Sequence, residues 1–231
     1  MKTIGLLGGM SWESTVTYYR IINEIVKKEL GGLHSAKCVL YSVDFDEIEK
    51  CQSSGDWAKS ADILSRDAKS LQAAGADFVV ICTNTMHKVA DDIQKNITIP
   101  ILNIADVTAM ALKKRNITTV ALLGTNYTME QEFYKGRLKK CGVNVIVPEK
   151  EQRMKINDVI FKELCVGVIN ESSKEYFLKV IAELAGKGAK GAILGCTEIG
   201  MLVKQKDTPV PLFDTTVIHA EAAAYMAMRK D

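Results

Sequence analysis

The sequence lacks long apolar runs, a charge imbalance and paired cysteines, and each absence argues against a class of protein. No apolar run approaches the ~18 residues of a membrane span, so no membrane partner is expected. The net charge is +2 and the basic residues are scattered, which argues against a nucleic-acid partner. The six cysteines include no C-x-x-C pair, so zinc-ribbon and thioredoxin-type sites lack support.

Motifs for nucleotides and metals are also missing. Gly5 to Gly9 does not have the G-x-G-x-x-G spacing, and no P-loop lysine follows. His34 and His219 have no acidic or cysteine partner at ligand spacing, so no metal site is expected. Because Met1-Lys2 leads directly into a predicted core strand, we expect no cleaved signal peptide and a cytoplasmic location.

Short β-rich apolar runs alternate with longer amphipathic stretches, which favours a parallel α/β fold. With 47% hydrophobic residues the chain can bury a substantial core. The expected strands are Thr3–Leu7, Cys38–Val43, Phe78–Ile81, Ile99–Leu102, Thr119–Leu123, Val143–Val147, Gly191–Leu194 and Val210–Phe213. The expected helices include Trp12–Glu29, Trp57–Ala73 and Tyr176–Ala185.

The two sets of strands match one another in the same order. The matching segments are Thr3–Gly9 with Thr119–Thr125, Gly75–Thr85 with Gly188–Glu198, and Ile99–Asn103 with Val210–Asp214. One such match could arise by chance, but three in order indicate an internal duplication. We therefore predict two pseudo-symmetric parallel-sheet α/β domains with the active site in the cleft between them, at the strands' carboxyl ends. The N-terminal domain is expected to span residues 1–115 with a closing C-terminal helix, 215–231, and the C-terminal domain residues 116–214.

Small polar residues follow the strands, where helices are expected to begin. Unpaired backbone N–H groups at helix N-termini can hold a carboxylate. Thr128 to Gln131 also fits a capping box. The alternative is that each loop merely caps its helix. The expected substrate-binding residues in these loops are Met10, Ser11, Asn84, Thr85, Thr125, Tyr127, Thr128, Thr197 and Glu198.

The repeat places Thr83 opposite Cys196, and Cys82 opposite Gly195. Cys196 is the best nucleophile or base, because a helix start beyond it can lower a thiol pKa from about 8.5 toward neutrality. A buried inert thiol is the alternative. Cys82 should point into the core, since side chains alternate along a strand. His87 is either a hydrogen-bond partner of the site or a packed core histidine.

At these residues the chain resembles the aspartate/glutamate racemases, whose superfamily also holds hydantoin racemases and maleate isomerases. The resemblance covers essentially the whole chain and is carried by Ile4–Trp12, Thr83–His87 and Gly195–Glu198. It implies a homodimer, an amino-acid substrate, and a two-base mechanism without pyridoxal phosphate or metal. One side chain removes the Cα proton while another supplies one to the opposite face.

Two departures from the family pattern concern the bases and the substrate clamp. Thr83 stands where the family's Cys-Asn-Thr-x-His motif begins, which leaves Cys196 as the one strong base and predicts faster turnover of the L form. Gln52 replaces an arginine that aspartate racemases commonly carry, and a lysine is missing around Cys165, although Lys155 or Lys162 could reach. A neutral clamp would admit neutral polar amino acids.

The sequence thus predicts a pyridoxal-phosphate-independent amino-acid racemase, with aspartate and glutamate as default substrates and Thr83 and Cys196 as catalytic residues. A broad-specificity racemase, or another superfamily isomerase of the hydantoin racemase or maleate isomerase type, is the alternative enzyme. A non-catalytic amino-acid binding protein is the alternative of another class.

Overall fold

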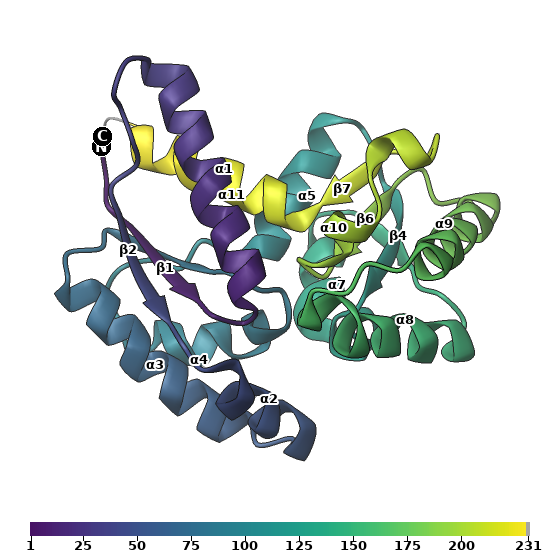
Figure 1. Ribbon diagram of the computed structural model, residues 1–231, viewed down its shortest axis with the longest axis horizontal. Helices are drawn as coiled ribbons and strands as arrows, with labels where there is room; N and C mark the ends of the chain where they lie inside the picture. The colour runs from purple at the N-terminus through teal and green to yellow at the C-terminus, as the bar shows by residue number, and fades with distance from the viewer. Residues whose placement is uncertain (230–231) are drawn as a thin grey trace. The chain divides into compact units, whose positions relative to one another are not determined.

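The computed structural model describes residues 1–229 and divides into two compact units. The first unit holds Met1–Asn103 and the residues from His219 on, and the second holds Ile104–Ile218. Each unit has its own parallel sheet with helices against it (Figure 1). None of the described helices is long and apolar enough to cross a membrane.

The equivalent strands of the two sheets have the same order, and the second sheet has one strand more. In the first unit the order is β2-β1-β3, and in the second it is β5-β4-β6-β7. Every pairing is parallel. The strands are β1 (Ile4–Gly8), β2 (Cys38–Ser42), β3 (Phe78–Ile81), β4 (Thr119–Gly124), β5 (Asn144–Ile146), β6 (Ala192–Gly195) and β7 (Leu212–Asp214).

The strand register repeats as well as the order. Leu7 pairs with Ile81 in the first sheet, and their sequence equivalents Leu123 and Leu194 pair in the second. The bridge between Val79 and Ile101 likewise recurs as the pair of Ala192 with Leu212. Because three separately aligned segments keep their partners, the structure supports the internal duplication.

The expected strand Ile99–Leu102 is reduced to a single bridge at Ile101. Val79 still donates to the Pro100 carbonyl and accepts from the Leu102 amide, both at 2.9 Å. Pro100 has no N–H, and the side chain of Gln94 accepts from the Ile101 amide at 2.9 Å. The Gln94 side chain therefore satisfies the Ile101 amide, which would otherwise need a further strand on the outer side of this segment.

In the first unit, α3 lies along one face of β1 and β2, and α1 along the other (Figure 1). Helix α1 begins where the Ser11 side chain accepts from the Ser14 amide, and it buries Tyr18, Ile22 and Val26 on one face. The other helices of this unit are α2 (Phe45–Ser54), η1 (Thr85–Val89, a 3₁₀ turn) and α4 (Ala90–Gln94); α1 spans Trp12–Leu30 and α3 spans Trp57–Ala73.

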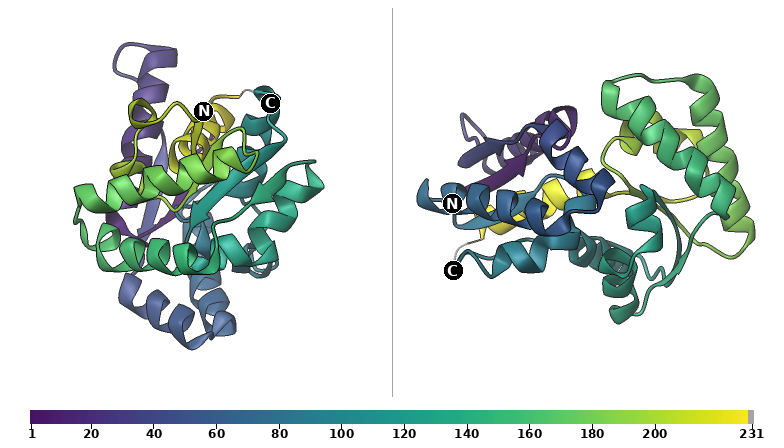
Figure 2. Two further views of the ribbon diagram at one scale, coloured as in Figure 1. Left: turned by 90° about the vertical axis from the view of Figure 1, so that its right-hand side faces the viewer. Right: turned by 90° about the horizontal axis from the view of Figure 1, so that it is seen from below.

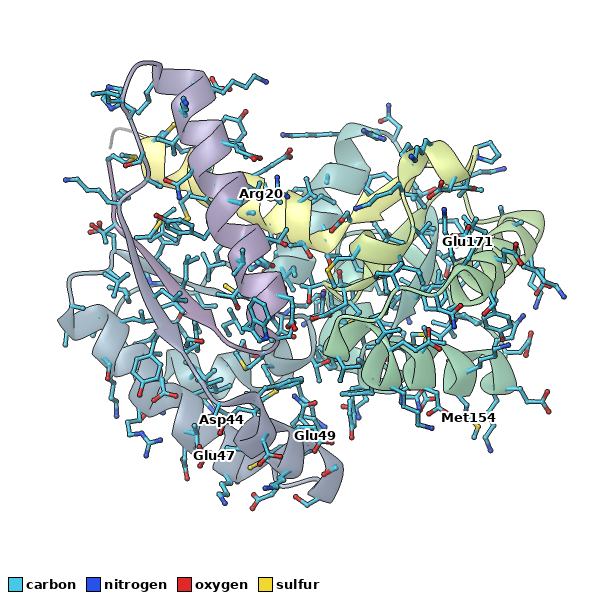
Figure 3. All side chains as sticks on the ribbon, viewed as in Figure 1. Arg20, Asp44, Glu47, Glu49, Met154 and Glu171 are labelled. Atoms are coloured by element: carbon cyan, nitrogen blue, oxygen red, sulfur yellow. The ribbon has the colours of Figure 1, made fainter. Side chains whose placement is uncertain are left out.

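In the second unit, α8 and α9 run side by side and both contact β4 (green in Figure 2). Met154 on α8 and Glu171 at the start of α9 point outward (Figure 3). The helices of this unit are α5 (Ile104–Lys114), α6 (Asn126–Glu130), α7 (Glu132–Lys140), α8 (Lys150–Lys162), η2 (Leu164–Val166), α9 (Glu171–Gly186), α10 (Ile199–Leu202) and η3 (Gln205–Asp207).

The last helix of each repeat belongs to the other unit. Helix α5 ends the first repeat, but Ile104, Ala105 and Leu112 lie in the apolar core of the second unit. Helix α11 (Thr215–Met228) ends the second repeat, yet its residues from His219 on belong to the first unit. The domain boundary predicted after residue 115 therefore lies one helix too late, since α5 packs against α7 and β7.

Paired glycines bring β4 and β6 together at their carboxyl ends. Gly124 pairs with Gly195, and a Cβ on Gly195 would lie 2.9 Å from the Leu123 carbonyl oxygen and 2.8 Å from Leu122 Cδ1. Backbone cannot retreat from such a contact without shifting the strand, so this position requires glycine.

We expect Gly195→Ala to lower the free energy of unfolding by about 1–3 kcal/mol, because the added methyl overpacks the strand pair. Urea unfolding followed by circular dichroism measures the change. Gly186→Ala is the matched control, since a Cβ there meets open space at the end of α9. Equal transition midpoints for the two variants would contradict this account.

Candidate active site

In the second unit, the strand register places Thr125 beside Cys196. Each residue directly follows one of the paired glycines, Gly124 and Gly195. Thr125 caps α6 by accepting from the Thr128 amide, and the two hydroxyls lie 3.2 Å apart. Tyr127 follows on the same helix and is partly exposed. The structure therefore brings the predicted residues of both loops to one end of this sheet.

The predicted capping box at Thr128 is wrong. Helix α6 begins three residues earlier, with Thr125 as its cap. Gln131, the fourth residue of the predicted box, instead precedes α7, and its side chain makes no capping hydrogen bond there. Thr128 is fully buried behind the loop.

The Cys196 thiol is hydrogen-bonded to a carboxylate. Its Sγ donates to Glu198 Oε2 at 2.9 Å, and the Thr197 hydroxyl donates to the same oxygen at 2.8 Å. Cys196 is 8% exposed and Glu198 2%. The Thr216 hydroxyl also donates to the Thr197 carbonyl at 3.4 Å. The loop that carries Cys196 is thus held by hydrogen bonds from its own side chains and from Thr216.

These surroundings raise the pKa of Cys196 well above that of an ordinary thiol. Burial is the largest cause, followed by the charge of Glu198, the neighbouring Cys165 and the hydrogen bond to Glu198. The expectation that a helix dipole lowers this pKa is therefore wrong. The helix beyond the loop, α10, begins only at Ile199 and is a single turn, and desolvation and a negative neighbour both favour the neutral thiol.

In the first unit, the loops after β1 and β3 also lie together. Ser14 donates from its hydroxyl to the Cys82 carbonyl at 3.4 Å, which ties the start of α1 to the end of β3. Met10 and Ser11 are buried, and the Ser11 carbonyl accepts from the Thr15 hydroxyl at 2.8 Å. The structure therefore gathers Met10 and Ser11 with the residues that follow β3.

Thr83 is partly exposed, whereas Cys82, Asn84 and Thr85 on either side of it are buried. Cys82 lies in the core, as side-chain alternation predicts, and complete burial raises the pKa of its thiol far above the usual value. A thiol in that environment stays neutral, so the accessible proton donor of this loop is the Thr83 hydroxyl.

Gln52 lies next to the same loop. Its side-chain amide donates to Met86 Sδ at 3.0 Å, and Met86 is part of η1, which follows Thr83. Gln52 is buried, whereas Asp44 and Glu47 of the same segment are exposed (Figure 3). An uncharged donor therefore stands beside the Thr83 loop, on the buried side of α2.

His87 belongs to the loop and has two neighbours that the sequence did not reveal. Its Nδ1 lies 2.8 Å from the Thr83 carbonyl oxygen. The ring of His219 packs against it with centroids 5.6 Å apart. His219 Nδ1 lies 2.9 Å from the Tyr18 hydroxyl, and its Nε2 lies 2.8 Å from the Leu102 carbonyl oxygen. Both predicted roles of His87 are combined, since it is packed and also holds the loop.

Two further residues near Cys196 were not expected in the site. Cys165 in η2, which contacts α10, is close enough to raise the pKa of Cys196. Asp214 is partly exposed, and its carboxylate accepts from the amides of Thr216 and Val217. A Cβ on Gly200 would collide with this carboxylate. Among the described residues, no group of three or more His, Cys, Asp or Glu side chains could hold a metal ion.

Comparison with known proteins assigns the chain to a family. The Asp/Glu/hydantoin racemase family matches residues 7–223. The chain belongs to this family. A Yersinia pestis protein assigned to the Asp/Glu racemases has a similar structure, with a TM-score of 0.92 and 55% identity over 99% of this chain and 100% of that one.

Two other relatives of this racemase-family chain are similar over nearly their full lengths. An aspartate racemase homologue from Pyrococcus horikoshii OT3 has a TM-score of 0.86 and 35% identity, covering 99% of this chain and 100% of that one. The broad specificity amino-acid racemase RacX of Bacillus subtilis is 23% identical over 97% of this chain and 98% of its own length.

We expect Glu198→Gln to make Cys196 more reactive toward iodoacetamide at pH 7.5, because removing the negative neighbour lowers the thiol pKa and increases the thiolate fraction. Mass spectrometry of the Cys196 peptide measures the alkylation rate. The Cys196→Ser protein provides the blank. Slower alkylation in Glu198→Gln would show that Glu198 promotes the thiolate in the resting protein.

Burial and the neighbouring His87 lower the pKa of His219 from 6.5 to about 3. Below about pH 6.5 the His219 imidazole therefore binds a proton in the unfolded chain but not in the folded chain. The free energy of unfolding should consequently fall as the pH drops from 6.5 to 5. The expected slope is about 1.4 kcal/mol per pH unit for one proton. It should disappear in His219→Gln and persist in the exposed-site variant His34→Gln, as measured by urea titration.

Proposed function

We propose that this chain is a cofactor-independent amino-acid racemase in which Cys196 and Thr83 act on opposite faces of the substrate Cα. The equivalence of the two residues carries the proposal. Each stands two positions after a strand residue, Ile81 or Leu194, that pairs in the same register in its own sheet. One proton-transfer group per repeat suits a reaction that removes a proton from one face and adds one to the other. Family membership supports the same class of reaction.

The contacts of Cys196 suggest how the reaction of an L amino acid begins. The resting thiol is neutral, so its proton first passes to Glu198, its hydrogen-bond acceptor. The thiolate then takes the Cα proton, and the Thr83 hydroxyl gives its own proton to the other face. Glu198 then gives its proton to water and water returns one to the Thr83 alkoxide, so the starting protonation of all three residues is restored. Donors around the substrate carboxylate stabilise the intervening carbanion.

The two bases differ in strength, and thermodynamics determines which kinetic constants can reflect that difference. Enantiomers have equal free energies, so kcat/KM must be the same in both directions. A D substrate needs Thr83 as the base, and a hydroxyl is rarely ionised near neutral pH. The D form should therefore have a lower kcat and a proportionally lower KM, while the L form has the higher kcat.

Aspartate and glutamate are the default substrates, and the surroundings of Thr83 and Cys196 favour a wider range. Gln52 stands where aspartate racemases commonly carry an arginine, and a lysine that they commonly carry is missing around Cys165. Neither feature would demand a side-chain carboxylate on the substrate. The name of the Bacillus subtilis relative, a broad specificity amino-acid racemase, supports this second candidate.

Proton NMR in D₂O tests the function directly. Purified protein is incubated with L- and D-aspartate, L- and D-glutamate, L-glutamine and L-homoserine, followed by chiral analysis. Loss of the Cα signal with inversion supports the racemase. Tight ligand binding without exchange would instead support a binding protein, and turnover only of a hydantoin or maleate would support another isomerase. The homodimer stays a prediction from the family resemblance, which light scattering can test.

Replacing Cys196 by Ser should abolish both exchange and inversion, because it removes the strong base. Thr83→Cys should raise the kcat of the D form toward that of the L form, since a thiol ionises far more readily than a hydroxyl. Steady-state kinetics in both directions measures the effect. Cys141→Ser, at an exposed position, is the control for loss of a thiol. Retained turnover in Cys196→Ser would overturn the assignment.

A further inference from the structure

Each unit contains a tyrosine that bonds to the helix received from the other repeat. In the first unit the Tyr18 hydroxyl lies 2.9 Å from His219 Nδ1. In the second unit the Tyr134 hydroxyl donates to the Thr108 hydroxyl at 3.4 Å. Tyr18 lies on α1, the first helix after β1, and Tyr134 lies on α7, which follows β4 and the short helix α6. All four side chains are buried. We call these contacts the two tyrosine latches.

The two latches differ in what lies beyond them. Thr108 closes its latch locally, because its hydroxyl donates to the Ile104 carbonyl on its own helix at 2.7 Å. His219 instead extends the contact to the Leu102 carbonyl and to the ring of His87. In the second unit a threonine is enough to bind the tyrosine to the helix from the other repeat. The imidazole in the first unit makes the same contact and also contacts Leu102 and His87.

The hydrogen-bond partners fix the protons on both imidazole rings. A carbonyl oxygen can only accept, so His219 carries its proton on Nε2, facing Leu102. Its Nδ1 is then an acceptor, and the Tyr18 hydroxyl donates to it. His87 must likewise carry a proton on Nδ1, which donates to the Thr83 carbonyl. Burial keeps His219 neutral, so it keeps one orientation across the working pH range.

The contacts that begin at Tyr18 and His219 lead to Thr83, the weaker of the two proposed proton donors. His87 holds the Thr83 carbonyl, and His219 packs against His87 at an interplanar angle of 64°. The equivalent of His87 in the second repeat is Gly200, where the Asp214 carboxylate occupies the space instead. Only the half with the hydroxyl is backed by paired imidazoles. A hydroxyl is not ionised in advance, so its proton transfer depends strongly on position.

We propose that His219 is a positioning residue for the Thr83 side of the racemase: it fixes the ring of His87, and through His87 the backbone and hydroxyl of Thr83. The proposal rests on the proposed function. It assigns a role to the last helix of the chain, which carries His219 into the first unit. Half of the proton-transfer machinery is then completed by a residue from the other repeat.

The decisive variant is His219→Thr, which gives the first unit the same pair of side chains as the Tyr134–Thr108 latch and removes the imidazole. Tyr134→Phe is the matched control, because it removes a buried latch hydroxyl from the other unit. Tyr18→Phe is a second variant, which keeps the imidazole but removes its hydroxyl partner. All three are compared as full-length protein with an L amino acid in D₂O.

Two rates separate the two proton-transfer groups. Deuterium incorporation with retention needs only Cys196, whereas inversion also needs Thr83. We expect His219→Thr to lower the inversion rate on the order of tenfold while exchange with retention changes less than about twofold. Tyr18→Phe should shift the ratio in the same direction, and Tyr134→Phe should leave it unchanged. An equal fall of both rates in His219→Thr, or no change in either, would overturn the proposal.

A spectroscopic readout does not depend on turnover. Long-range proton–nitrogen NMR distinguishes the tautomers of the three histidines. The wild-type protein should show His87 as the Nδ1–H form and His219 as the Nε2–H form, with exposed His34 as a reference signal. His219→Thr should convert His87 to a mixture of tautomers. An unchanged His87 signal would refute the positioning role, whereas an absence of turnover in the wild type would refute only the proposed function.

Discussion

The need of a parallel sheet for helices on both faces governs this structure. Each repeat encodes a sheet and most of its covering helices, but its last helix covers the sheet of the other repeat. Buried alanines make this possible in the first unit: Ala220, Ala223, Ala224 and Ala227 form one face of α11 and allow close packing. The bond from His219 to the Leu102 carbonyl joins the points where the chain leaves and re-enters that unit. The first unit is therefore built from two separate segments, with the second unit, Ile104–Ile218, between them in the sequence.

The packing of each repeat's last helix in the other unit is the part of the fold that could not be predicted from the sequence. Short β-rich apolar runs located the strands and amphipathic stretches located the helices, and β3 and α3 have their predicted bounds. Repeat alignment predicted the pairing, because equivalent segments must keep equivalent partners. No local signal says which sheet an amphipathic helix covers, so α5 was assigned to the wrong half. The predicted strand Ile99–Leu102 is likewise only a bridge, because Pro100 lacks an N–H and the Gln94 side chain binds the Ile101 amide. The apolar pattern of the segment does not encode these contacts.

For the site, the repeat revealed more than any single motif. Thr83 is unremarkable alone and becomes a catalytic candidate only as the counterpart of Cys196. Tyr18 and His219 were missed as partners of the loop because they are distant in sequence from His87 and from each other. The dipole argument for Cys196 failed for another reason. It considered the helix that follows but not the burial of the thiol or the carboxylate two residues later, and these two effects dominate.

The two halves have diverged in a chemically consistent direction. Around Cys196, burial and the carboxylate of Glu198 disfavour a thiolate until a proton can be passed on. Around Thr83, the hydrogen bond from His87 and the packing of His219 against it fix the geometry of the loop. A thiol can be controlled through its ionisation, since its pKa lies within reach of a neighbouring charge. A hydroxyl cannot, so position is the property that its neighbours can control. Each half therefore supports its proton-transfer group through the property that limits that group.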